Sequence, residues 1–143
     1  MSNLINLLDT YKGEKRELYP LTPSQMGVYL SCMHNPKGTM YNIPCTYVFD
    51  SGSLDTDRLI NAVRKAVDNH PVMKIFIDSS TGSPMMKPRD SVDFDIPVVQ
   101  VDNLEQAGKD FVKPFDLEKD ILFRFAVFEC GDKSMFEIGR AHV

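Results

Sequence analysis

The sequence contains no tryptophan, only three cysteines and no long apolar run. Cys32, Cys45 and Cys130 are far apart and form no C-x-x-C pair, which predicts buried thiols in a reducing compartment and neither a disulfide framework nor a zinc site. No apolar run approaches the roughly 18 residues that a membrane span needs. The first residues lack the basic flank of a signal peptide. We therefore expect a cytoplasmic protein with no membrane partner.

The sequence also lacks an excess of basic residues. Its 16 lysines and arginines are outnumbered by 20 acidic residues, which gives a formal net charge of -4. A protein that binds the nucleic-acid backbone needs a basic face, so we expect no nucleic-acid partner. The sequence has neither a glycine-rich phosphate loop nor a cluster of metal ligands, and it predicts no directly bound cofactor or metal.

The composition is that of a globular domain. The 143 residues are 43% hydrophobic and 25% charged, which is enough apolar material for one core of ordinary size. Residues 1–18 differ from the rest, because they combine a short amphipathic stretch with the charged run Lys12–Glu17. We interpret residues 1–18 as a leader or interdomain linker with a turn or two of helix.

Capping residues mark the starts of two helices. Thr22 can cap the first, with Pro23 at the first helical position and Gln25 where a capping box requires Glu or Gln. Asp55 can cap the second, and Pro71 should end it.

Hydrophobic periodicity predicts the remaining elements. In order, we expect a helix from Thr22 to about Met33, a strand over 42–50, a helix over Leu54–His70, strands over 72–77, 85–88 and 93–101, a short helix over 103–112, a strand over 120–130 and a strand from Lys133. Single helices between hairpin-like strand pairs indicate an α+β fold of mixed layers.

The first of four ordered motifs lies at the start of the first helix. The stretch 21–30 reads Leu-Thr-Pro-Ser-Gln-Met-Gly-Val-Tyr-Leu. It resembles the first core motif of condensation domains from nonribosomal peptide synthetases, which is Ser, any, Ala, Gln, any, Arg, aliphatic, aromatic. Gln25 and Tyr29 match, Thr22 and Ser24 replace the Ser and Ala, and Gly27 replaces the Arg.

The other three motifs lie at 41–44, 69–77 and 114–124, which is their order in the family. Residues 69–77 resemble Arg-His-Glu, any, Leu-Arg-Thr, any, Phe, with His70 matching and Lys74 replacing an Arg. Pro-Phe-Asp-Leu at 114–117, followed by Ile-Leu-Phe-Arg at 121–124, resembles a further family segment. Tyr-Asn-Ile-Pro at 41–44 is also a common family phrase. We interpret residues 19–136 as the N-terminal part of a condensation domain.

This resemblance implies an incomplete chloramphenicol-acetyltransferase-like fold, of which the chain is part of the N-terminal subdomain. In the family a tunnel between two subdomains admits phosphopantetheine arms from opposite sides. The implied reaction joins an aminoacyl or peptidyl thioester to the amine of a second aminoacyl thioester. The implied partners are peptidyl carrier domains, which carry the phosphopantetheine, and an adenylation domain in the same or a neighbouring chain.

The family's catalytic motif, His-His, any three, Asp-Gly, is not present. It would follow the strand after the Gly131-Asp132 turn, where the chain instead reads Glu-Ile-Gly-Arg-Ala-His-Val over 137–143. That heptapeptide is the translation of GAG-ATC-GGA-AGA-GCA-CAC-GTC, a common sequencing adapter. We interpret residues 137–143 as an adapter artefact, and we assign no catalytic role to His142 or to any other residue.

The resemblance gives scaffold roles to two cations. The family's Arg at the position of Lys74 pairs with the Asp of the absent motif, and Arg124 should meet a carboxylate or a carbonyl inside its apolar strand. His70 should interact with the last carbonyls of its helix. Two alternatives stay open for the parent protein: an acyltransferase of the same superfamily that uses coenzyme A, and a non-catalytic member that only docks proteins.

Overall fold

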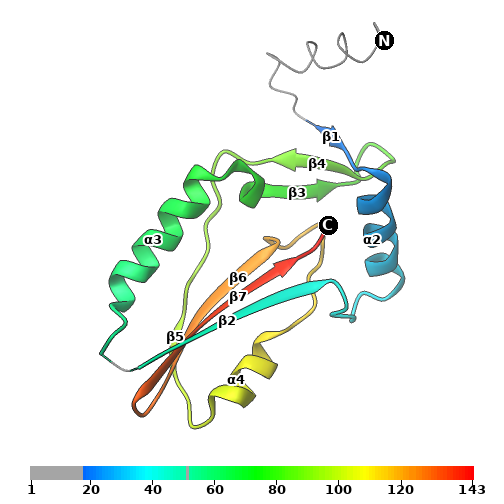
Figure 1. Ribbon diagram of the computed structural model, residues 1–143. Helices are drawn as coiled ribbons and strands as arrows, with labels where there is room; N and C mark the ends of the chain where they lie inside the picture. Colours follow the sequence, from blue (N-terminus) through cyan, green and yellow to red (C-terminus); the bar gives the residue numbers. More distant parts are fainter. Residues whose placement is uncertain (1–17, 51) are drawn as a thin grey trace, which may run out of the picture.

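The computed structural model describes residues 18–50 and 52–143 (Figure 1). The amphipathic stretch of the expected leader lies outside the described residues. The elements in chain order are β1 (Tyr19–Pro20), α2 (Pro23–His34), β2 (Asn42–Asp50), α3 (Thr56–Asn69), a 3-10 helix η1 (Pro71–Lys74), β3 (Ile75–Asp78), β4 (Met85–Pro88), β5 (Val98–Gln100), α4 (Leu104–Phe111), β6 (Phe123–Cys130) and β7 (Lys133–Ala141).

The strands of the described residues form two sheets. A small antiparallel sheet has the order β1-β4-β3, and a larger sheet has the order β2-β7-β6-β5. Every pair in the larger sheet is antiparallel except β5 with β6. The helices α3 and α4 lie on opposite sides of this larger sheet (Figure 1). The expected mixed α+β fold is confirmed, and the segment predicted as a strand over 120–130 pairs with its successor.

The helix starts follow the capping residues. Thr22 accepts a hydrogen bond from the Gln25 backbone N–H, and Gln25 Oε1 accepts one of 2.9 Å from the Thr22 N–H, so the capping box is complete. Asp55 caps α3 through a 3.0 Å bond from the Arg58 N–H. These two helices were therefore predicted correctly, to within two residues at each end.

The predicted strand over 72–77 is wrong in its first half. Residues Pro71–Lys74 form η1, because the Met73 N–H donates to the His70 carbonyl at 2.9 Å and closes a tight turn directly after the proline. The strand predicted over 120–130 begins only at Phe123. The Lys119 and Asp120 N–H groups bind the Asp116 carbonyl in a preceding turn.

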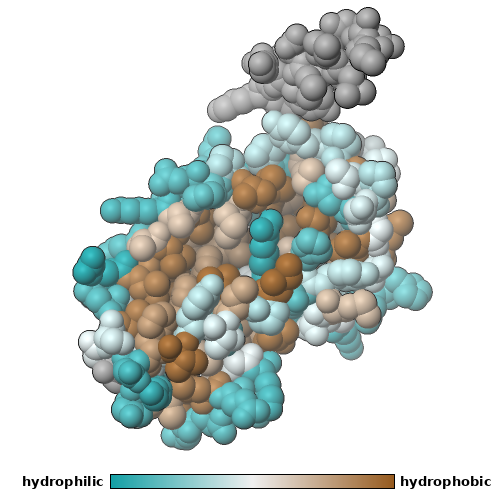
Figure 2. Space-filling model, viewed as in Figure 1, coloured by the Kyte–Doolittle hydropathy of each residue, from teal (hydrophilic) through white to brown (hydrophobic). Residues whose placement is uncertain are grey.

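The main core lies between α3 and the larger sheet. Val67 from α3 packs against phenylalanines of β6 and β7, and Phe94 meets Phe123 edge to face with centroids 5.0 Å apart. The space-filling view shows hydrophobic residues gathered between α3 and this sheet (Figure 2). The predicted strand over 93–101 shortens to three residues, because the segment before Pro97 contributes side chains to this core instead of a ladder.

The three cysteines are free thiols, but the predicted burial is wrong, because Cys45 is exposed and Cys32 and Cys130 are only partly buried. Among the described residues, no helix is both long and apolar enough to cross a bilayer.

Candidate functional site

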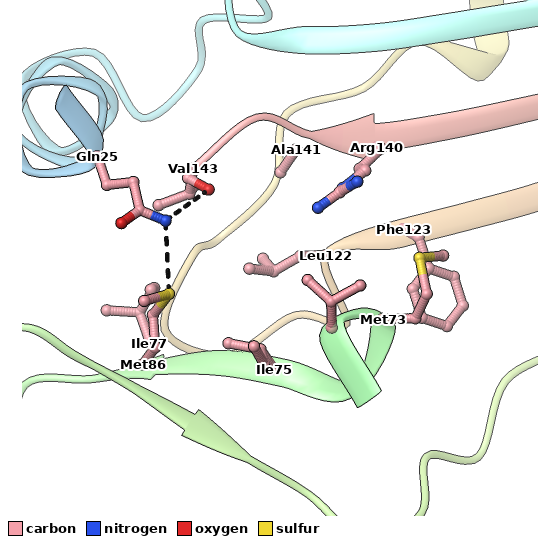
Figure 3. Close-up of a pocket in the computed structure, with 11 residues that line it drawn as sticks. Gln25, Met73, Ile75, Ile77, Met86, Leu122, Phe123, Arg140, Ala141 and Val143 are labelled. Atoms are coloured by element: carbon pink, nitrogen blue, oxygen red, sulfur yellow. Dashed lines mark hydrogen bonds between the residues drawn. The ribbon is translucent and has the colours of Figure 1, made fainter. Parts of the chain in front are cut away.

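The end of β7 opens into a pocket of about 110 Å³ between the two sheets. The end of η1, strand β3 and the start of α2 surround it (Figure 3). This is the end of the strand that follows the Gly131-Asp132 turn, where the family resemblance places the catalytic motif. The lining residues are Gln25, Val72, Met73, Ile75, Ile77, Met86, Leu122, Phe123, Arg140, Ala141 and Val143.

The pocket is apolar except for one amide and one guanidinium. Gln25 Nε2 lies 3.4 Å from the carbonyl oxygen of Val143 and 3.5 Å from the sulfur of Met86 (Figure 3). Gln25 therefore uses its oxygen for the helix cap and its nitrogen to hold the end of β7. Arg140 carries the only ionisable side chain among the described lining residues.

His142 does not belong to this pocket. Its side chain is exposed, its backbone N–H donates to the Tyr41 carbonyl at 2.8 Å, and it borders a separate, smaller pocket beside Asn35 and Phe115. None of the described lining residues of the main pocket is a His, Asp, Glu, Cys or Lys that could serve as a general base.

Tyr29 joins α2 to the Pro-Phe-Asp-Leu segment. The buried Tyr29 donates from its hydroxyl to Glu118 Oε1 at 2.7 Å. The hydrogen bond to Glu118 raises the pKa of Tyr29, with burial adding to the effect. Hydrogen bonds from Ser79 and then Tyr29 lower the pKa of Glu118. Two of the family-like segments are thus in direct contact.

Arg124 is held on the other face of the sheet. Its guanidinium donates to the carbonyls of Lys113 at 2.8 Å and Pro114 at 3.0 Å, and it lies 3.8 Å above the Phe115 ring. Burial lowers the pKa of Arg124, and the charge of Asp120 partly offsets this. The expected contact with a carbonyl is therefore present, and it fixes the Pro-Phe-Asp-Leu segment to β6.

Lys74 and His70 stabilise the end of α3. Lys74 Nζ donates to the carbonyls of Asp68 and Asp90, both at 3.0 Å. His70 Nδ1 lies 2.7 Å from the Ala66 carbonyl, which agrees with the expected interaction at the helix end. Neither Lys74 nor Arg124 lines the main pocket, and their roles as an active-site scaffold stay predictions.

Two residues of the tail have surroundings that the sequence did not indicate. Arg140 lines the pocket, and Glu137 is buried in the middle of the larger sheet with 2% of its surface exposed. Burial raises the pKa of Glu137, and the Thr46 hydroxyl bond partly opposes this. Because residues 137–143 resemble a translated sequencing adapter, the sequence alone assigns no role to Arg140 or Glu137. Strand alternation alone would have placed Glu137 on the face that packs against α4.

Comparison with known protein families shows which family this chain belongs to. The family model described as "Condensation domain" matches residues 15–142. The chain belongs to the condensation-domain family. The match includes most of the 137–143 tail, and β7 also continues to Ala141. The adapter origin of the tail stays a prediction.

The curated relatives of this condensation domain are large synthases. It is 32% identical over 124 residues to bacitracin synthase 3 of Bacillus licheniformis, a match covering 85% of this chain and 2% of the relative. It is 28% identical over 130 residues to gramicidin S synthase 2 of Aneurinibacillus migulanus, covering 89% of this chain and 3% of the relative. The chain thus spans only a small part of these relatives.

Solved condensation domains share the fold. The starter condensation domain of rhizomide synthetase RzmA matches with a TM-score of 0.77 and 18% identity, over 89% of this chain and 34% of that one. A four-domain nonribosomal peptide synthetase, holo-AB3403 bound to AMP and glycine, matches with a TM-score of 0.77 and 15% identity, over 95% of this chain and 11% of that one. The predicted fold family, of which this chain forms an incomplete part, is confirmed.

Proposed function

We propose that the parent protein forms amide bonds between aminoacyl or peptidyl thioesters held on the phosphopantetheine of carrier domains. The observation that carries this proposal is the condensation-domain match over residues 15–142, with β7 ending at an apolar pocket. Relatives named for bacitracin, plipastatin and gramicidin S synthesis support a peptide product. An adenylation domain in the same or a neighbouring chain completes the proposed assembly, and the free thiols favour a cytoplasmic location.

In the proposed reaction the amine of one thioester attacks the carbonyl carbon of the other. The new C–N bond forms, the C–S bond breaks, the amine loses a proton, and the leaving thiolate takes one up. A histidine at the end of β7 would accept the proton or orient the amine. The 143-residue chain has no such group among the described pocket residues, so we expect it to be inactive by itself.

The scaffold roles belong to the same proposal. Arg124 would set the position of β6 by binding the Lys113 and Pro114 carbonyls. Lys74 would set η1 beside the pocket by tying the end of α3 to Asp90. Gln25 and Tyr29 would hold α2 against the end of β7 and the Glu118 carboxylate. All of these contacts position the pocket wall and none touches a reacting atom.

One observation favours a second candidate, an acyl donor carried on coenzyme A. A variant of the rhizomide starter condensation domain was solved in complex with C8-CoA, and it matches this fold with a TM-score of 0.75 at 18% identity, over 87% of this chain and 31% of that one. A coenzyme A thioester presents the same phosphopantetheine arm and thioester chemistry. The third reading, a non-catalytic docking member, predicts a degenerate motif in the gene.

The deciding experiment starts from genomic DNA. Sequencing past the codon for Phe136 should reveal His-His, any three, Asp-Gly, followed by carrier or adenylation sequence. The complete domain should then join a carrier-bound donor to a carrier-bound acceptor, measured as a dipeptidyl thioester by intact-protein mass spectrometry. Replacing the motif histidines with alanine is the control that should abolish product.

Each other outcome selects a different function. Product from a coenzyme A donor but not from a carrier-bound donor would establish the second candidate. An intact fold with a degenerate motif and no product from either donor would establish docking. A gene that continues into an unrelated architecture would overturn all three.

A further inference from the structure

A segment between α4 and β6 connects the two sheets. Residues 113–118, which we call the strap, read Lys-Pro-Phe-Asp-Leu-Glu and run past the end of β7 (Figure 1). The strap belongs to no helix or strand, so its place is set by the contacts that it makes with other elements. These contacts are all made within the residues 15–142 that the family model matches.

The first half of the strap is bound to the larger sheet. The Lys113 carbonyl accepts a 2.6 Å hydrogen bond from Asn42 Nδ2 of β2 and a 2.8 Å bond from the Arg124 guanidinium of β6. The same guanidinium donates to the Pro114 carbonyl at 3.0 Å. Because β2 and β6 are the two strands that flank β7, this half of the strap is fixed to both neighbours of β7.

The second half of the strap is bound to the smaller sheet and to α2. The Ile77 N–H of β3 donates to the Leu117 carbonyl at 3.4 Å. The Glu118 carboxylate accepts a 2.7 Å bond from the Tyr29 hydroxyl of α2 and a further bond from Ser79, which directly follows β3. The strap therefore ties the smaller sheet and α2 to the larger sheet.

The end of β7 lies against the strap. Ala141, the last residue of β7, shares a buried hydrophobic cluster with Phe115 of the strap. The N–H of His142 donates to the carbonyl of Tyr41 at 2.8 Å, and Tyr41 directly precedes Asn42. Asn42 therefore holds the strap while its neighbour holds the backbone at the end of β7, where the family resemblance places the catalytic motif.

We propose that Asn42 and Glu118 are positioning residues for the reaction proposed above, because they hold the two ends of the strap against which β7 ends. Neither residue touches a reacting atom. Loss of either attachment lets the strap shift and displaces the backbone at positions 141 and 142, from which the motif would continue. The effect on rate rests on the proposed function, whereas the effect on the backbone does not.

Both attachments can be weakened with little change in side-chain shape. Asn42→Asp replaces the Nδ2 donor with an oxygen, which repels the Lys113 carbonyl oxygen that Nδ2 now binds. Glu118→Gln removes the charge that strengthens the bonds from Tyr29 and Ser79, and it leaves one acceptor oxygen where the carboxylate has two.

Kinetics of the complete domain, produced from the genomic sequence, test the effect on rate. Asn42→Asp and Glu118→Gln should each lower kcat for the dipeptidyl product about tenfold, because a misplacement of about 1 Å can cost about 100-fold. KM for both carrier-bound substrates should change by less than about twofold. Asn42→Gln keeps an amide donor and should recover part of the loss. The exposed controls Asn61→Asp and Glu105→Gln should leave kcat unchanged.

The double variant distinguishes a strap from two unrelated contacts. With one end of the strap free, freeing the other adds little, so Asn42→Asp/Glu118→Gln should be no more than about twofold slower than the slower single variant. Losses that multiply in the double variant would overturn the proposal. So would single variants that keep the wild-type kcat or change only KM.

Amide hydrogen exchange of the same domain gives a readout that does not depend on activity. The N–H groups at positions 141 and 142 bind the carbonyls of Leu122 and Tyr41, and Glu118 lies outside these bonds. Glu118→Gln should nevertheless speed their exchange about tenfold, whereas Glu105→Gln should not. Ser79→Ala gives the same test if Glu118→Gln does not fold.

The two measurements separate this proposal from the proposed function. A wild-type domain that forms no product would overturn the proposed function, and the exchange rates at positions 141 and 142 would still judge the strap. Faster exchange at these positions in Glu118→Gln would support the strap. Unchanged exchange would overturn it, whatever the activity of the domain.

Discussion

The Thr46 hydroxyl donates a 2.7 Å hydrogen bond to Glu137 Oε1 across the β2–β7 pair. The second carboxylate oxygen of Glu137 is buried, and the described residues supply it no hydrogen-bond partner. Gly108 of α4 approaches the same carboxylate so closely that a Cβ there would lie 3.1 Å from Oε1. The centre of the sheet therefore contains a half-satisfied acid, which is an unfavourable arrangement for folding.

Replacing Glu137 with Met should stabilise the chain. The substitution removes the buried, half-satisfied carboxylate and keeps the length of the side chain, and the exposed Thr46 can bind water instead. We expect a gain of about 1–3 kcal/mol in the free energy of unfolding at neutral pH, measured by urea denaturation. Glu105→Met, at an exposed position of α4, is the control and should change the free energy of unfolding by less than about 0.5 kcal/mol. A loss of stability in Glu137→Met would contradict the prediction.

The effect of Glu137 should depend on pH. Because burial raises the pKa of the folded carboxyl above its ordinary value of 4.5, the folded state binds more protons than the unfolded state. Stability from this group is complete below pH 4.5 and falls as pH rises toward the folded pKa. The difference in unfolding free energy between Glu137→Met and wild type should therefore be larger at pH 7 than at pH 4.

Comparing Glu137→Met with wild type at the same pH cancels the contributions that the other carboxylates make to the free energy of unfolding. Several have lowered pKa values and give the opposite slope, with stability lost as pH falls; these are Asp50, Asp78, Asp116 and Glu118. A difference that is the same at both pH values would show that the Glu137 carboxyl titrates normally in the folded chain.

Tyr29→Phe should weaken the contact between α2 and the Pro-Phe-Asp-Leu segment. It removes only the hydroxyl that binds Glu118, and we expect a loss of about 1–2 kcal/mol in unfolding free energy. The pKa of Glu118 should also rise toward its ordinary value, which carboxyl NMR titration can follow. Tyr41→Phe is the control, because it removes a tyrosine hydroxyl other than the one that binds Glu118. An unchanged Glu118 titration would show that the bond is not formed in solution.

Arg124→Lys should destabilise the chain although it keeps the charge. An ammonium cannot bind both the Lys113 and Pro114 carbonyls while stacking flat on Phe115. We expect a loss of about 1–2 kcal/mol, measured by urea denaturation, compared with almost none for the exposed Arg58→Lys. Equal stability of the two variants would mean that Arg124 contributes only its charge.

Local signals predicted the elements whose ends are decided by nearby residues. Thr22 with Gln25 and Asp55 marked the helix starts, because a cap acts within one turn of the chain. Two strands begin later than predicted because a local turn precedes each of them, at His70–Met73 and at Asp116–Asp120. Another element was missed because its partner is far along the chain. Tyr19 and Pro20 form β1 only because they pair with Met86 and Met85, and this pairing has no local signature.

The partners of the candidate site residues were also predictable only where the signal is local. The carbonyl partners of Arg124 and the helix-end role of His70 followed from the cost of burying an unpaired cation and from the exposed carbonyls of a helix terminus. The two carbonyls that Lys74 binds, at Asp68 and Asp90, were not predictable. They depend on how the loop after β4 returns beside α3.

The contact between Gln25 and Val143 is made to a backbone oxygen, which every amino acid has. The link from α2 to the end of β7 is therefore indifferent to the side chain at position 143. A different residue at position 143 would leave the amide of Gln25 able to bind the backbone at the same point.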